Sequence, residues 1–123
     1  MNFKEKIPYR KFKPSPSSKT EIKDCGIIEL EKDEQITFFT NTKKKYDFTA
    51  KEWGFYVTPS INRRLLNEGF KTALVQNNSG NIFVMVVEIE KTVNFIRYCN
   101  ENTLKVIHWL DEWQKNSKIK LII

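Results

Sequence analysis

Apolar and polar positions alternate with a period of two through residues 25–57, a pattern that is typical of half-buried β-strands. The alternation predicts four short strands, at residues 26–30, 35–40, 46–50 and 53–57. The charged run at residues 31–34 forms a turn between the first two strands, so we expect these two to pair as a β-hairpin. The last two strands are rich in aromatic residues, which favours strand structure.

The pattern changes to that of a helix after residue 57. Thr58 can cap free backbone amides, and Pro59 at the first helical position loses no hydrogen bond, so a helix is predicted to begin here. Gly69 is the matching end, because glycine readily adopts the conformation that closes helices. We expect the residues on the buried face of this helix to be Ile61, Leu65 and Leu66.

The second half of the chain combines strands with helices. The residues of the turn Asn77-Asn78-Ser79-Gly80 tolerate positive φ, and they predict a hairpin of strands 70–76 and 81–89. The elements expected after it are an amphipathic helix at 92–100, a strand at 104–109 and a short helix at 111–115. Val93, Ile96 and Cys99 are expected on one side of the amphipathic helix, with Phe95 and Tyr98 adjacent. An apolar segment at 119–123 is expected to pack on the sheet or on a partner.

This order of elements predicts an α+β fold, in which two main helices pack on an antiparallel sheet. Residues 53–109 run β-α-β-β-α-β, the order of a ferredoxin-like unit. Strand 81–89 is apolar on both faces. A central strand that is covered on both sides explains this pattern, and a homodimer interface through the sheet is the alternative.

Residues 1–24 differ in composition from the rest of the chain. They hold seven basic residues against three acidic ones, and three of the four prolines. Their few aliphatic side chains cannot bury enough surface to offset chain entropy, so we expect a flexible basic N-terminal arm. Residues 25–123 then form a single α+β domain, which has a size that one packed core supports.

Composition and charge narrow the function classes. The longest mostly apolar run, 82–87, is too short to cross a bilayer, and nothing near Met1 resembles a signal peptide, so we expect a cytoplasmic protein. His108 is the only histidine and there are two cysteines, so the sequence predicts no metal site and no cofactor. Most of the formal charge of +6 lies in the arm, which makes the folded part a poor nucleic-acid surface.

Five residues around the start of the first predicted helix form the candidate site. Trp53 and Tyr56 can stack on a sugar ring or a base, and the alternative is that such rings fill the core. Ser60, Asn62 and Arg63 can contact a phosphate at the positive end of the helix dipole, and the alternative is an ordinary helix end with solvated arginines. No nucleophile elbow or glycine-rich phosphate loop is present, so catalytic residues are unknown.

The stretch from Tyr46 to Asn62, continued by residues 70–75, resembles uncharacterised small proteins of bacterial surface-polysaccharide gene clusters. The resemblance implies a sugar-related context and no reaction. The sequence therefore predicts an accessory domain of cell-surface carbohydrate metabolism that binds a sugar, sugar-phosphate or nucleotide-sugar ligand. One alternative is a nucleic-acid-binding module that uses the basic arm and the sheet aromatics. The other is a small homodimeric enzyme with an unrecognised site, for which the candidate groups are Cys25, His108, Asp24 and Asp47.

Overall fold

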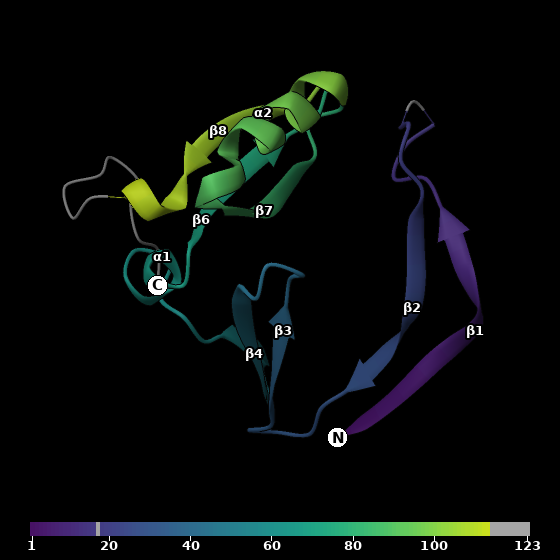
Figure 1. Ribbon diagram of the computed structural model, residues 1–123. Helices are drawn as coiled ribbons and strands as arrows, with labels where there is room; N and C mark the ends of the chain where they lie inside the picture. Colours follow the sequence, from purple (N-terminus) through teal and green to yellow (C-terminus); the bar gives the residue numbers. More distant parts are fainter. Residues whose placement is uncertain (17, 114–123) are drawn as a thin grey trace. The chain divides into compact units, whose positions relative to one another are not determined.

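The computed structural model describes residues 1–16 and 18–113 (Figure 1). The chain divides into two compact units. The first unit comprises Met1–Phe38 and Tyr46–Thr58, and the second comprises Phe39–Lys45 and Pro59–Ile123. None of the described helices is long and apolar enough to cross a membrane. The apolar segment expected at 119–123 lies outside the described residues.

A long antiparallel hairpin opens the first unit. It is formed by β1 (Asn2–Phe12) and β2 (Ile22–Glu29). Asp24 in β2 accepts a hydrogen bond from Lys6, at 2.7 Å, and a longer one from the guanidinium group of Arg10, at 3.4 Å. One carboxylate thus ties two cations of β1 to the neighbouring strand.

The structure corrects two expectations for this hairpin. Residues 2–12 were expected within a flexible arm, and they instead form a paired strand. Most side chains of β1 are exposed, so the strand is held by backbone pairing and by charges across the two strands. A strand held in this way needs no apolar stripe, and the sequence therefore shows none. The hairpin predicted from residues 26–30 and 35–40 is also wrong, because the first of these segments lies in β2 and pairs with β1.

The first unit also holds most of a three-stranded sheet in the order β3-β4-β5. Its strands are β3 (Gln35–Phe39), β4 (Lys45–Lys51) and β5 (Gly54–Val57), so the strands expected at 46–50 and 53–57 are confirmed. Alternation gives the sheet two different faces. The apolar face carries Phe38, Phe48, Ala50, Phe55 and Val57. The polar face carries Gln35, Thr37, Asp47, Thr49, Tyr56 and Thr58.

The sheet of the second unit has the order β7-β6-β8. Its strands are β6 (Phe70–Gln76), β7 (Ile82–Glu88) and β8 (Lys105–Trp109). The predicted hairpin of β6 and β7 is confirmed. The Asn77 side chain stabilises its turn, because its Oδ1 accepts hydrogen bonds from the amides of Ser79, at 3.0 Å, and Asn81, at 2.9 Å.

The helices differ from the prediction of two main helices. The helix α2 (Thr92–Glu101) is present, but α1 (Arg64–Asn67) is only one turn. Thr58 does not cap α1, because the helix begins only at Arg64 and Arg63 occupies the capping position. The Thr58 amide instead donates to the Asp47 carbonyl, at 3.1 Å, and continues the contact between β5 and β4. Two short 3₁₀ turns, η1 (Ile89–Lys91) and η2 (Leu110–Glu112), complete the described elements, and η2 stands where the last short helix was expected.

The ferredoxin-like arrangement is also corrected. That fold would require the strand at 53–57 in the same sheet as the later three, whereas β5 pairs with β4. In the second unit, β6 is the central strand, and β7 and β8 flank it on either side. The two flanking strands are both antiparallel to β6, so they run parallel to each other and α2 is the crossover that connects them.

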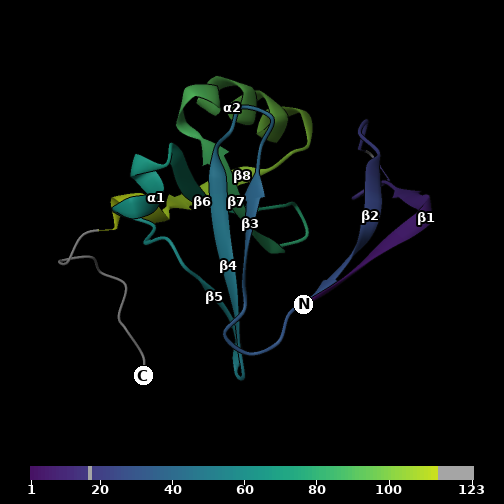
Figure 2. The same cartoon turned by 60° about the horizontal axis from the view of Figure 1, so that its bottom comes forward.

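The helix α2 lies across one face of the β7-β6-β8 sheet (Figure 2). The register places Ala73, Val75, Met85, Val87 and Trp109 on this face, and the opposite face carries Phe70, Thr72, Leu74, Val84, Val86 and His108. A central position was one of the two explanations for the apolar faces of strand 81–89, and the structure does not support it, because among the described strands β7 stands at the end of its sheet. In α2 only Cys99 of the expected stripe is buried, whereas Val93 and Ile96 are exposed.

Candidate functional site

A groove of about 410 Å³ lies between β7 and α2 in the second unit. Its strand side is formed by residues 85–88. Its helix side is formed by Lys91, Asn94, Phe95 and Tyr98. These four positions are spaced by one, three and four residues along the chain, so they lie on one side of the helical segment. We call this hollow the β7–α2 groove.

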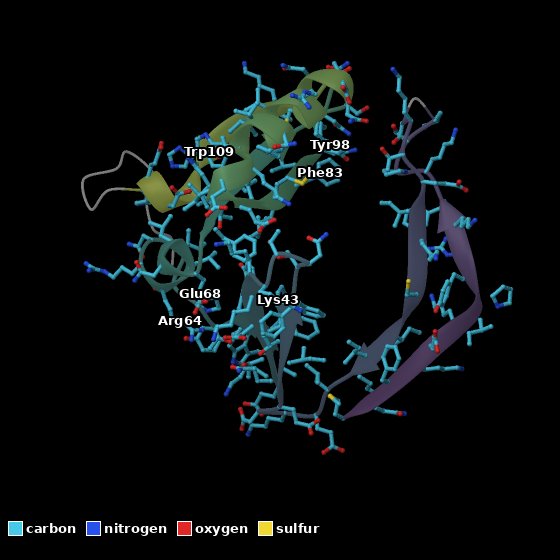
Figure 3. All side chains as sticks on the ribbon, in the orientation of Figure 1. Lys43, Arg64, Glu68, Phe83, Tyr98 and Trp109 are labelled. Atoms are coloured by element: carbon cyan, nitrogen blue, oxygen red, sulfur yellow. The ribbon has the colours of Figure 1, made fainter. Side chains whose placement is uncertain are left out.

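The floor of the β7–α2 groove is apolar and aromatic. Phe95 packs edge-on against Trp109 of β8, with 5.8 Å between ring centroids and an interplanar angle of 67°. The ammonium group of Lys71 lies 3.9 Å from the centre of the Trp109 ring. The Phe95 ring is therefore held by a strand of the sheet, whereas Tyr98 lies nearly one turn further along α2 and is exposed (Figure 3).

Glu88 is the most constrained polar group of the groove. Its side chain is 13% exposed, and Lys91 Nζ lies 3.6 Å from its Oε2. Its Oε1 accepts a hydrogen bond from the hydroxyl of Thr42. Both oxygens thus have a partner that fixes the carboxylate, and each still has acceptor capacity for a further donor. Asn94 contributes an amide, which can donate and accept hydrogen bonds.

Sequence reasoning missed this groove. It predicted the helix that carries Asn94, Phe95 and Tyr98, and it assigned no ligand role to these residues. The available signal was the spacing of positions 91, 94, 95 and 98, which follows directly after an apolar strand that ends at Glu88. That signal does not distinguish a groove from a packed interface, because both need one helical face that combines apolar and polar groups.

Two of the five predicted site residues, Trp53 and Tyr56, belong to the first unit. Trp53 lies in the turn between β4 and β5 and is 69% exposed. Tyr56 lies opposite Thr49 on the polar face of the β3-β4-β5 sheet and is 49% exposed. Neither ring fills a core, so both are accessible for stacking. Their role in ligand binding stays a prediction.

The other three predicted site residues belong to the second unit. The Ser60 hydroxyl accepts a hydrogen bond from the Arg64 amide, at 2.9 Å, while Asn62 and Arg63 are exposed. The expected phosphate contacts relied on a helix dipole, and the four residues of α1 are too few to build one. The helix dipole therefore gives no support to phosphate contacts at Ser60, Asn62 and Arg63. The residues that line the β7–α2 groove include none of the five predicted site residues.

The groups considered for catalysis are divided between the units, with Asp24, Cys25 and Asp47 in the first and His108 in the second. The hydrogen bond from Lys6, followed by Arg10, holds the pKa of the Asp24 carboxyl below its ordinary value. Asp47 accepts a hydrogen bond from Thr37, at 2.6 Å. Both acids therefore have structural partners. Across residues 1–16 and 18–113, no group of three or more His, Cys, Asp or Glu side chains could hold a metal ion.

No protein-family model, curated protein or solved structure matches this chain. The function of the chain is therefore inferred from the geometry and chemistry of its own residues.

Proposed function

We propose that this chain is a non-catalytic accessory domain of bacterial cell-surface carbohydrate metabolism, and that it binds a sugar in the β7–α2 groove. The observation that supports the proposal is the set of residues that line this groove, which include the acidic Glu88, the amide-bearing Asn94 and the aromatic Phe95 and Tyr98. Sugars present hydroxyl groups at their edges and apolar C–H groups on their faces. A groove with an aromatic floor and a few fixed polar groups suits both.

The charges of the groove favour a neutral sugar over a sugar phosphate or a nucleotide sugar. Among the lining residues that the structure describes, Lys91 is the single cation, and Glu88 lies 3.6 Å away and compensates it. A phosphate would compete with the carboxylate for Lys91 and would meet its negative charge. Neutral hydroxyl groups can donate to Glu88 and accept from Lys91 or Asn94 without this cost.

Calorimetry and amide-resolved NMR on the full chain test the proposal. The ligands are neutral mono- and oligosaccharides, sugar phosphates and nucleotide sugars. Asn94→Ala and Tyr98→Ala are each expected to weaken neutral-sugar binding by about 5- to 30-fold, because each removes a contact of about 1–2 kcal/mol. If none of the ligands binds the wild-type chain, the proposal is wrong.

Two further variants serve as matched controls. Asn100→Ala changes an exposed asparagine of α2 that does not line the groove, and it should bind with wild-type affinity. Tyr56→Ala tests the rings that the sequence predicted in the first unit. A loss of binding in Tyr56→Ala together with wild-type binding in Tyr98→Ala would assign the sugar to Trp53 and Tyr56 instead of the groove.

One observation favours nucleic-acid binding as a second candidate function. Lys11 in β1 lies directly opposite Lys23 in β2, and the Lys23 ammonium lies 4.8 Å from the centre of the Tyr9 ring. Like charges that face each other across two strands destabilise a hairpin, and a phosphate backbone would relieve this repulsion. Binding of an oligonucleotide that weakens steeply with salt and in Lys23→Gln would support this candidate. Absence of binding at low salt would reject it.

A further inference from the structure

We infer that two copies of this chain pair through the free edge of β7, and that the pairing completes the β7–α2 groove. The statement about the groove rests on the proposed function, whereas the pairing itself does not. Within the described residues, β7 pairs only with β6 and so forms one end of its sheet. An end strand has a row of backbone groups that no neighbour satisfies, and it can pair with another strand.

The hydrogen bonds around β7 show which backbone groups face outward. The Ile89 amide donates to the Gly69 carbonyl, and the Asn77 amide donates to the Asn81 carbonyl. In an antiparallel ladder, alternate residues bond to the same neighbour, so the odd-numbered residues of β7 face β6. The amide and carbonyl groups of the even-numbered residues therefore point to the free edge. These residues are Ile82, Val84, Val86 and Glu88.

The two ends of this sheet differ in how they are protected against pairing. The β8 end carries Lys105 and a register shift where it meets Leu74 and Val75, and both features discourage a further strand. The β7 end has neither a charged residue nor a proline from Ile82 to Val87. Its side chains are also exposed in the middle of the strand, where Val84 is 64% exposed. Hence β7 is the end that is open to pairing.

A second copy of β7 fits this edge without any change in the strand. With Met85 on the two-fold axis, antiparallel pairing sets Val84 opposite Val86 of the partner subunit and Ile82 opposite Glu88 of the partner subunit. All these residues are even-numbered, so each presents its outward backbone groups to the other copy. The match uses the whole length of β7. It also gives the exposed Val84 side chain an apolar neighbour.

The pairing changes the groove. Val86 is among the residues that line the groove, and its backbone amide and carbonyl groups face the free edge of β7, so the groove borders this edge. A two-fold axis perpendicular to the sheet keeps both copies of α2 on the same side. The open sides of the two grooves then join into one trough between the two helices. The partner subunit's Met85 and the partner subunit's Val87 extend its floor, which suits a chain of several sugars.

Light scattering over a range of protein concentrations tests the pairing. The wild-type chain should change from the mass of one chain to the mass of two as its concentration rises. Val84→Lys places a charge on the free edge and should raise the dissociation constant at least about tenfold. Val93→Lys is the matched control, since it makes the same change at an exposed valine of α2, and it should leave the dissociation constant unchanged.

Two further measurements separate the possible results. Val84→Pro removes an amide that points away from β6, so it should disrupt the dimer and leave the fold intact, as judged by circular dichroism. Hydrogen exchange in the wild type should slow with protein concentration at the amides of Val84 and Val86. A chain that stays monomeric at every concentration would overturn the inference. This holds even if the free edge of β7 were found to bind an extended peptide. A dimer that neither Val84 variant weakens would overturn it as well.

The ligand arm of the experiment separates this inference from the proposed function. A dimer that binds no sugar would support the pairing and reject the sugar. A monomer that binds sugar would support the proposed function and overturn the pairing. Wild-type oligosaccharide affinity in a monomeric Val84→Pro would show that the groove does not need the second copy.

Discussion

Lys91 Nζ lies 3.6 Å from Glu88 Oε2 in the lining of the β7–α2 groove, so a cation and an anion offset each other where we place the sugar. Replacing Glu88 with glutamine keeps the shape of the side chain and removes its charge. Because the strong acceptor is lost, neutral-sugar binding should weaken by about 5- to 30-fold. Because Lys91 is no longer paired, binding of sugar phosphates should become tighter. Calorimetry with both ligand classes measures the two changes.

Glu90→Gln is the control for this charge change. Glu90 has an 83% exposed side chain, and its Lys44 partner is 3.8 Å away. It does not line the groove, so the variant should bind both ligand classes with wild-type affinity. If Glu88→Gln weakened both classes equally, the carboxylate would have only a structural role, and the preference for a neutral sugar would be wrong.

Leu65 is completely buried, although it belongs to the one-turn helix α1. Truncation of this side chain to alanine leaves a cavity, so Leu65→Ala should lower the free energy of unfolding by about 2–5 kcal/mol. Urea denaturation measures this loss. The neighbouring Leu66 is only partly buried, so Leu66→Ala should cost clearly less. Equal losses would mean that α1 does not pack as described.

The parts of the fold that the sequence predicted are those set by local patterns. The Asn77-Gly80 turn and the apolar runs on either side fix the β6 and β7 hairpin, because all the required contacts are between near neighbours. The helix expected from Thr58 failed for a non-local reason. The Thr58 amide donates a hydrogen bond to the carbonyl of Asp47, which lies on another strand, and the residue pattern around Thr58 does not indicate that partner.

The candidate site could be predicted only in part. The exposure of Trp53 and Tyr56 follows from a turn and from strand alternation, which the sequence shows. The groove depends on α2 crossing back over a sheet whose end strand is β7, and strand order cannot be read from alternation. The exposure of Val93 could not be predicted for the same reason, since a side of α2 becomes buried or exposed only when the crossover is placed.

A substitution at Gly26 in β2 tests whether β1 is a paired strand. A Cβ atom at this position would lie 2.6 Å from the backbone carbonyl oxygen of Lys4, so Gly26→Ala must push the two strands apart. We expect β1 to open, and trypsin should then cleave after Lys4 and Lys6 faster than in the wild type. Cys25→Ala, at the exposed neighbouring position, should be cleaved at the wild-type rate. Equal rates in all three proteins would show that residues 2–12 are a flexible arm after all.

The pKa of Asp24 provides a second test of the same hairpin. The hydrogen bond from Lys6, followed by Arg10, lowers this pKa below its ordinary value of 3.8. A lowered pKa in the folded state means that Asp24 stabilises the hairpin above pH 3.8 and that this contribution is lost as the pH falls through the folded-state pKa. An NMR titration of the carboxyl carbon should therefore have its midpoint below 3.8, and Lys6→Met should raise it. A midpoint at 3.8 that Lys6→Met leaves unchanged would mean that Asp24 does not bind Lys6 across the two strands.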